Sequence, residues 1–561
     1  MENIDLYDRI QVRVNEMRRR REPIISFWED IQRYMLPWHG RNLGGESASE
    51  VDDVTRDHSE IFSQAPEDAI DRLAAGFQFG MTPRTDAWFA MTLDDMDVAD
   101  KHGVREYLHE VERRMRLVFA RSNLYDVLHH FYIELIGFGT AALACLEDEE
   151  TVVRFKPFTA GEYLISQNHR GEVDCFYREL WMTARQMVER FGEDNISWDV
   201  NAAMADGQPE KLFRVCQMIE PNTPQMKGLN LIDKKFRSVY YEKNHRKEDR
   251  RFLEVKGYNE FPVMVGRWRV VGDDVWGRGP GMKVLPDVKS LYKITENTLI
   301  ALDKVLDPPM VVPGSMKNDY IDRFPGGVSF SEDMTGADSF RPLYQIRPDI
   351  KSAEYIKEQL ASAIQRGFFN DIFLMLTNTP DTKRMTAYEV QGRKEEKMTM
   401  LGPVLGRLQG ELLGQLIDRT FAVMSRAGLF PEPPAEIQGK NITVKYLSIL
   451  ARAQESGVVN AMMQLLNFTG ALAQVKEDVL DKLNADGMFE EFADAIGAPP
   501  SVMVGEQDVQ AQRQARAEAM QQQQQMAMAQ SAAQTAETAS KTKMGEDNLL
   551  DRVARQADEQ S

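Results

Sequence analysis

The spacing of apolar and polar residues divides the first 285 residues into a helical part followed by a part built from strands. Apolar residues first recur at helical spacing in four segments, each bounded by glycine, proline or clustered polar residues. From Ala141 to Tyr258 apolar and polar residues alternate between turn residues, which is typical of β-strands, with one short helix at 182–191. The four expected helices are residues 4–36, 65–79, 104–119 and 126–135. This part of the pattern predicts an α+β chain.

Two long helices are predicted on either side of a compact insert in the middle of the chain. The first covers residues 286–306, a length of about 30 Å, and ends before two consecutive prolines. Residues 307–348 hold short apolar runs among prolines and glycines, which is typical of a small β-containing module. The second helix covers residues 349–376, where apolar residues step by four: Ile356, Leu360, Ile364, Phe368, Ile372 and Leu376. With these long helices, the chain as a whole is expected to be mainly α-helical.

A third long amphipathic helix is expected at residues 385–433, after a loop at 377–384. Glycine recurs in it at every fourth position, although each glycine inside a helix costs about 1 kcal/mol relative to alanine. We interpret this glycine ladder as a surface for close packing of another backbone, in the same chain or in another copy; the alternative is bending of the helix near Pro403. The ladder consists of Gly402, Gly406, Gly410 and Gly414.

The C-terminal part is less regular. A short strand and three helical pieces are expected between residues 434 and 505. Residues 506–561 are rich in glutamine and alanine, and this composition fits either an extended helix or a disordered tail.

Composition narrows the function classes. The chain has 561 residues and a formal net charge of −19, which argues against a protein that grips nucleic acid over its whole surface. Three cysteines show no paired spacing and fit a reducing compartment. We find neither a signal-peptide pattern nor an apolar run that could span a membrane, so we expect synthesis in a cytoplasm and no membrane partner.

The sequence contains no recognisable catalytic, cofactor or metal motif, so we predict none of these sites and no enzymatic activity. The glycine-rich residues 277–283 fit neither phosphate-binding pattern, and we interpret them as a tight turn that enters the next helix. Lys383 and Arg384 are either simply solvated or placed to contact a phosphate backbone. For the basic run at residues 18–21 we favour a role at a helix end or a subunit interface.

Four segments together resemble the portal, or head-to-tail connector, proteins of short-tailed double-stranded DNA bacteriophages. The resemblance rests on their order and combination, and it covers most of the chain up to residue 434. The segments are SQAPEDAIDRLAAGFQFGMTPRTDAWFAMT (63–92), SNLYDVLHHFYIELIGFGTAAL (122–143), EFPVMVGRWRVVGDDVWGRGPGMKVLPDVKSLYKI (260–294) and TAYEVQGRKEEKMTMLGPVLGRLQGELLGQLIDRTF (386–421).

The resemblance implies the portal fold, in which a wing, a two-helix stem, an inserted clip and a helical crown assemble as a ring, usually of twelve copies. Carried over to this chain, its parts would be a wing (1–285), a stem helix (286–306), a clip (307–348), a second stem helix (349–376), a tunnel loop (377–384), a long wing helix (385–433), a crown (434–505) and a tail (506–561). The loop would face DNA through Asn378, Thr379, Asp381, Lys383 and Arg384.

The resemblance also implies partners and a location. The ring would surround double-stranded DNA without sequence preference at one vertex of the capsid, for packaging and ejection of the genome. It would dock the large subunit of a separate terminase, a tail adaptor, and the major capsid and scaffold proteins. An acidic ring with a few basic residues would let DNA slide while positioning it.

Two other functions stay open at this stage. One is a structural adaptor or scaffold of the virion without a channel. The other, which no motif favours, is an enzyme that acts on DNA.

Overall fold

The computed structural model describes most of the first 306 residues and separate segments after them. Predictions that fall on the remaining residues, such as the loop at 377–384, lie outside the described residues. The described residues are 2–41, 43, 61–99, 101–222, 234–243, 252–306, 310–311, 341–342, 349–370, 401–437, 439–447, 462–470, 484, 487–489, 492 and 506–541.

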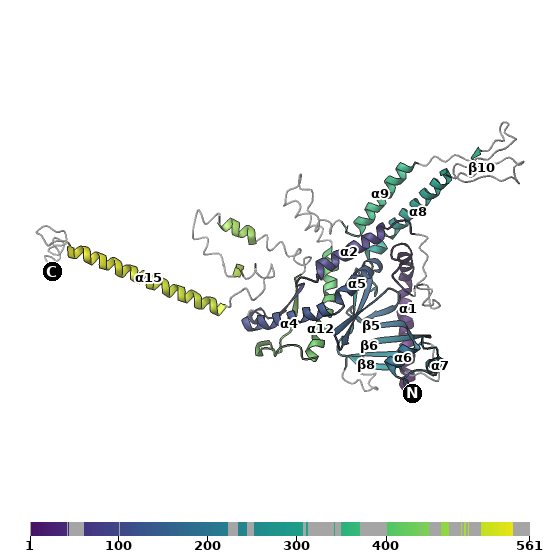
Figure 1. Ribbon diagram of the computed structural model, residues 1–561, viewed down its shortest axis with the longest axis horizontal. Helices are drawn as coiled ribbons and strands as arrows, with labels where there is room; N and C mark the ends of the chain where they lie inside the picture. The colour runs from purple at the N-terminus through teal and green to yellow at the C-terminus, as the bar shows by residue number, and fades with distance from the viewer. Residues whose placement is uncertain are drawn as a thin grey trace.

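The β-rich part is an antiparallel five-stranded sheet in the order β4-β5-β6-β7-β8 (Figure 1). Because side chains alternate along a strand, Cys216 and Met218 of β6 reach one face while Val215 reaches the other. Helices cover both faces. The strands are β4 (Tyr163–Gln167), β5 (Val173–Thr183), β6 (Leu212–Pro221), β7 (Phe236–Glu242) and β8 (Glu254–Tyr258).

Helix α1 (Glu2–Tyr34) lies against the first face of this sheet and contributes Leu6, Ile10, Val14 and Met17 to its core. These residues step by three or four, so they share one helix face. Two short helices cover the other face. They are α6 (Ala184–Phe191), which begins with a capping box between Thr183 and Gln186, and α7 (Trp198–Ala205).

The main core surrounds α5 (Leu124–Phe138), which is buried along most of its length. A three-stranded antiparallel sheet in the order β3-β2-β9 continues from it. The elements around α5 are α2 (Ala65–Met81), α4 (His102–Arg121), β2 (Thr140–Asp148), β3 (Val152–Phe158) and β9 (Val263–Arg267). Strand β1 (Phe89–Leu93) pairs with β12 (Ile442–Tyr446), which lies far along the chain. In the sequence β1 follows α2 and precedes the short α3 (Met96–Ala99).

Two helices project together from this body (Figure 1). They are α8 (Pro280–Leu306) and α9 (Ile350–Gly367). Beyond α8, Met310–Val311 (β10) pairs antiparallel with Arg341–Pro342 (β11). The described residues thus show the two helices; most of the expected insert between them lies outside the described residues.

The third long helix is described from residue 401 to 426 and contains the π-helical segment η5 (Gln409–Gly414), followed by α12 (Gln415–Arg426). After the 3-10 turn η6 (Ala435–Ile437) and β12, residues 462–470 are helical. Glu506–Lys541 form one helix, α15. This resolves the alternatives for the tail as far as Lys541.

The described residues contain the helices and strands expected before residue 306, add the short helices α3 and α7 that the pattern did not predict, and place three boundaries of the long helices differently. The first long helix begins at Pro280 instead of residue 286, because proline is well suited to the first position of a helix. The second ends at Gly367 instead of residue 376, at a turn that includes Phe369 with a φ of 56°. The third ends at Arg426 instead of residue 433, where a positive φ at Gly428 turns the chain.

Candidate functional site: the helix pair and the helix that follows it

The helix pair α8–α9 is anchored at its base and exposed toward its tip. Val284, Leu285 and Tyr292 of α8 are buried in the main core, and Tyr292 Oη donates to the carbonyls of Tyr34 (2.8 Å) and Ser63 (2.9 Å). Beyond Tyr292 the apolar side chains of α8 are half-buried or exposed. The exposed ones on the two helices are Leu299, Ile300, Val305, Leu306, Ile350, Tyr355 and Ile356.

Glycines hold the base of α8 against the end of α5. Gly139 has a φ of 80°, and a Cβ there would collide with the backbone nitrogen of Gly279. A Cβ on Gly279 would lie 2.8 Å from the Ile136 carbonyl, and one on Gly281 would collide with the Gly137 carbonyl. Residues 277–279 thus lead into α8, whereas residues 280–283 of the predicted turn are already helical, and the glycines allow direct backbone contact.

The sequence pattern did not predict the contact between residues 137–139 and residues 279–281. The signal was present as two glycine clusters, the pair Gly137 and Gly139 and the run at residues 277–281. Spacing within one segment does not reveal that two segments meet, because the contact joins residues about 140 positions apart.

The end of α9 has an unusual conformation. Ile364 and Phe368 are buried, and Gly367 lies so close to Val284 of α8 that an added Cβ would collide with it. Phe369 adopts a left-handed conformation that is rare for a bulky residue, and its ring stacks on Trp268 with centroids 6.3 Å apart. The chain therefore leaves the helix pair at a defined point on the body.

The predicted tunnel-loop residues lie outside the described residues. They are Asn378, Thr379, Asp381, Lys383 and Arg384. The structure describes the chain up to residue 370 on one side of them and from residue 401 on the other.

The glycine ladder lies along the helix at residues 401–426, mostly on the face away from the core. Leu401, Leu405, Leu408 and Leu412 are buried, whereas Gly406 and Gly410 are exposed. Apart from the adjacent backbone of the same helix, no described heavy atom lies within 4 Å of a Cβ built on Gly406 or Gly410. The described residues thus supply no backbone that packs against these two glycines.

The other two glycines of the ladder differ from this pair. A Cβ on Gly414 would meet the Tyr446 hydroxyl oxygen at 3.4 Å, and that hydroxyl donates to the Gln409 carbonyl (2.9 Å). Gly414 therefore accommodates a side chain of the same copy. Gly402 is half-buried.

An ion pair links η5 to the β-rich part. Arg267, the last residue of β9, donates through Nη2 to Glu411 Oε1 (2.6 Å), and its backbone nitrogen donates to Glu411 Oε2 (3.0 Å). The same guanidinium donates to the Gly171 carbonyl (2.7 Å) and to Gln167 Oε1 (2.9 Å) in the β4–β5 hairpin. Because π-helical turns widen the helix locally, this segment brings Glu411 to Arg267 without moving the apolar face from the core.

The described residues contain no cluster of three or more histidine, cysteine or acidic side chains that could hold a metal ion. Cys145, Cys175 and Cys216 are free and buried, and burial raises the pKa of the Cys145 thiol to about 11. A thiol in that state is a poor nucleophile. Within the described ranges no helix has both the length and the apolar character that crossing a bilayer requires.

Comparison with known proteins gives consistent matches over the whole chain. Residues 7–504 match the family model described as "Bacteriophage head to tail connecting protein". The chain is 36% identical to the portal protein of Salmonella phage epsilon15 over 552 residues, which covers 98% of each chain. It is 34% identical to a probable portal protein of Bordetella phage BPP-1 over 550 residues, which covers 97% of each chain.

Solved structures resemble the chain more distantly. A chain from the neck of an empty GTA particle is 12% identical, with a TM-score of 0.34, and the match covers 73% of this chain and 85% of that one.

Proposed function

This chain belongs to the family of bacteriophage head-to-tail connecting proteins, and on that premise we propose that copies of it close into a ring around a channel for double-stranded DNA. It functions as a portal, the connector between head and tail. The observation that carries the proposal is the match to phage portal proteins over nearly the full length of both chains.

The exposed apolar side chains of the helix pair support assembly into a ring. Leu306 is 73% exposed and Tyr355 is 63% exposed in the single chain. Several exposed apolar side chains on one helix pair are typical of an interaction site. A ring requires a heterologous interface, in which one surface of each copy meets a different surface of the next. The exposed residues of α8 and α9 would supply one of these surfaces, and Gly406 with Gly410 would supply close packing against the next copy.

The charge of the chain fits a conduit through which DNA slides. A net charge of −19 opposes tight retention of phosphates. Lys383 and Arg384 would face the duplex from the tunnel loop and attract its backbone without reading sequence. Asn378, Thr379 and Asp381 would complete that loop. Twelve copies in the ring is the number that the family resemblance suggests.

The ring would be a structural component of the virion and would catalyse no reaction itself. The insert between α8 and α9 would dock the terminase, whose large subunit supplies the ATPase for packaging. A tail adaptor and the major capsid and scaffold proteins would bind other parts of the ring. The protein would be made in the bacterial cytoplasm before it enters the capsid vertex.

A charge reversal in the proposed tunnel loop tests this function. Lys383→Glu combined with Arg384→Glu should reduce the DNA content of assembled particles while rings still form. The matched control is Arg170→Glu combined with Arg185→Glu, two exposed residues of the β-rich part. Normal packaging by the Lys383 and Arg384 double variant would contradict the assignment of these residues to the channel.

A further inference from the structure

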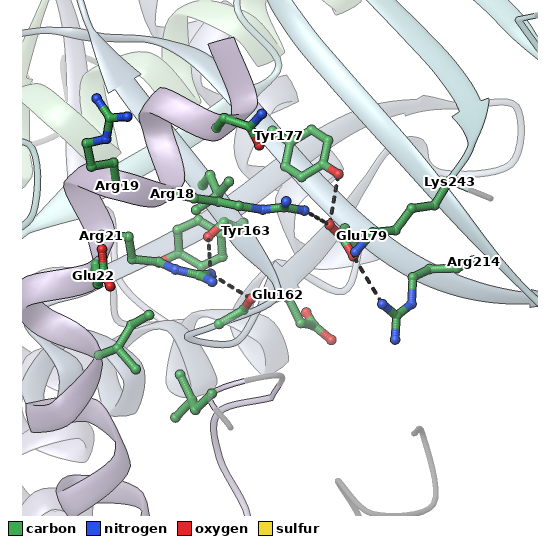
Figure 2. Close-up of a pocket in the computed structure, with 15 residues that line it drawn as sticks. Arg18, Arg19, Arg21, Glu22, Glu162, Tyr163, Tyr177, Glu179, Arg214 and Lys243 are labelled. Carbon is green, nitrogen blue, oxygen red and sulfur yellow. Dashed lines mark hydrogen bonds and ion pairs between the residues drawn. The ribbon is translucent and has the colours of Figure 1, made fainter. Parts of the chain in front are cut away.

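A cavity of about 390 Å³ lies between α1 and the five-stranded sheet, as Figure 2 shows. Five of its lining side chains are basic and three are acidic, so the lining carries a formal charge of 5 − 3 = +2. The cavity lining is thus positively charged, although the whole chain has a negative net charge. The basic residues are Arg18, Arg19, Arg21, Arg214 and Lys243.

Cations from three separate elements converge on one carboxylate in this cavity. Glu179 of β5 accepts from Arg18 Nη2 of α1 (2.6 Å) and from Lys243 Nζ after β7 (2.8 Å). Arg214 Nη1 of β6 lies 3.9 Å from the same carboxylate, and Tyr177 Oη donates to it (2.9 Å). These donors therefore surround the oxygen atoms of the Glu179 carboxylate. The same arrangement of charged donors could recognise the oxygen atoms of a bound oxyanion.

Arg21 lies beside this group and has unused donor capacity. Its Nη1 donates to the carbonyls of Gly161 (2.9 Å) and Tyr163 (3.4 Å), and Figure 2 shows its side chain extending toward Tyr163 and Glu162. Its Nε is buried and has no acceptor. Burial, and after it the charge of Arg18, lowers the pKa of Arg21 to about 10. A buried donor without a partner is costly, but Nε is closed to solvent, so an anion in the cavity would meet other atoms of the Arg21 side chain.

We propose that this cavity binds an oxyanion of the phosphate class, either free phosphate or the phosphate group of a mononucleotide. The dianion of phosphate has a charge that matches the surplus of the lining. The volume lies within the range of small-ligand sites. The guanidinium of Arg21 and the cations around Glu179 bind the phosphate oxygens. Because these groups belong to α1, β5, β6 and the residue after β7, the bound anion also strengthens the attachment of α1 to the sheet.

Titration calorimetry on the full chain tests the site, with inorganic phosphate and deoxyadenosine monophosphate as separate ligands in chloride buffer. Arg21→Met removes the charge but keeps the aliphatic part of the side chain, and should weaken binding by about tenfold or more. Arg20→Met is the matched control, because Arg20 is on the same helix, pairs with Glu16 and does not line the cavity. Tighter binding of phosphate than of the nucleotide identifies a free-ion site, and the reverse identifies a phosphate-ester site.

A second variant keeps the test decisive if Arg21→Met does not fold. Glu179→Gln removes the competing negative charge and should tighten phosphate binding, with a larger rise of the melting temperature on adding phosphate than in the unmodified protein. Equal affinities in the unmodified chain, Arg21→Met and Glu179→Gln would overturn the proposal. The absence of saturable binding at millimolar phosphate would also overturn it.

Discussion

The guanidinium of Arg267 and the carboxylate of Glu411 lie 2.6 Å apart at their closest atoms and join β9 to the π-helical turn of η5. Arg267 is almost fully buried and also holds the β4–β5 hairpin through Gly171 and Gln167. The Arg267 side chain thus connects both sheets to the helix at residues 401–426, which follows the predicted tunnel loop in the chain. A movement of that helix relative to the β-rich part would have to break this ion pair.

Replacing Arg267 by methionine should destabilise the body of the protein. Glu411 would keep only the partly exposed Arg407 as a charged partner (3.1 Å), and removing one member of a buried pair costs about 3 kcal/mol. We expect a fall of that size in the free energy of unfolding, measured by urea denaturation with tryptophan fluorescence. Arg278→Met is the control: its ion pair with Asp274 is exposed and should contribute less than about 1 kcal/mol. Equal losses in the two variants would contradict the linking role of Arg267.

The glycine contact at the base of α8 predicts a difference between two glycines with the same backbone conformation. Gly139 and Gly171 both have a φ of 80°, but only Gly139 has backbone atoms where a Cβ would go. Gly171→Ala should cost about 1 kcal/mol for its left-handed conformation alone. Gly139→Ala should cost several times more or prevent folding, because the backbone of residues 277–279 cannot yield as a side chain does. Soluble yield and melting temperature of the two variants would measure this, and similar values would refute the close-packing account.

This contact illustrates what could and could not be predicted from the sequence. The positions of α8, α9 and the strands followed from local spacing and from proline and glycine signals. The packing of Gly139 against Gly279 and the pairing of Arg267 with Glu411 join distant segments, and local patterns do not specify such pairs. The π-helical turn was also unpredictable, because it depends on the tertiary contacts of Glu411 and Gln409 with Arg267 and Tyr446.

The glycine ladder also shows what local spacing cannot predict. Spacing correctly placed Gly406 and Gly410 on one helix but gave no information on which of its faces meets the core. The early end of α9 is similar: the four-residue step of Phe368 and Ile372 favours a continued helix, whereas the left-handed Phe369 and its contact with Trp268 end it.

An ion pair at the end of α1 predicts a pH dependence of stability. Burial disfavours the charged form of His39, but the hydrogen bond from Nδ1 to Glu134 Oε1 (2.8 Å) and the charge of Glu134 outweigh it and raise the His39 pKa. A raised pKa in the folded state contributes stability that is complete below the unfolded value of about 6.5 and is lost as pH rises through the folded value.

His39→Gln should therefore lower the melting temperature more at about pH 6 than at about pH 8.5. His169→Gln, at an exposed position, is the control and should leave the pH profile unchanged. A loss from His39→Gln that is the same at both pH values would show that the imidazole acts only by packing.

The exposed glycines predict an assembly defect without a folding defect. Gly406→Leu and Gly410→Leu place side chains where the described residues leave open space, so the melting temperature of the monomer should change little. If the next copy packs there, ring formation should fall sharply, as size-exclusion chromatography with light scattering would record. Gly103→Leu is the matched control, because Gly103 is also a helical glycine with open space around it. Rings at the unmodified yield in both ladder variants would contradict intersubunit packing at the ladder.

The central claim is that copies of this chain close into a ring around a channel, and electron microscopy of the purified full chain tests it most directly. We predict end views of closed rings with a central hole wide enough for a DNA duplex, and side views in which the α8–α9 pairs form a narrower stalk. Images that show only monomers or small closed dimers, at concentrations where related connectors would assemble, would contradict the account.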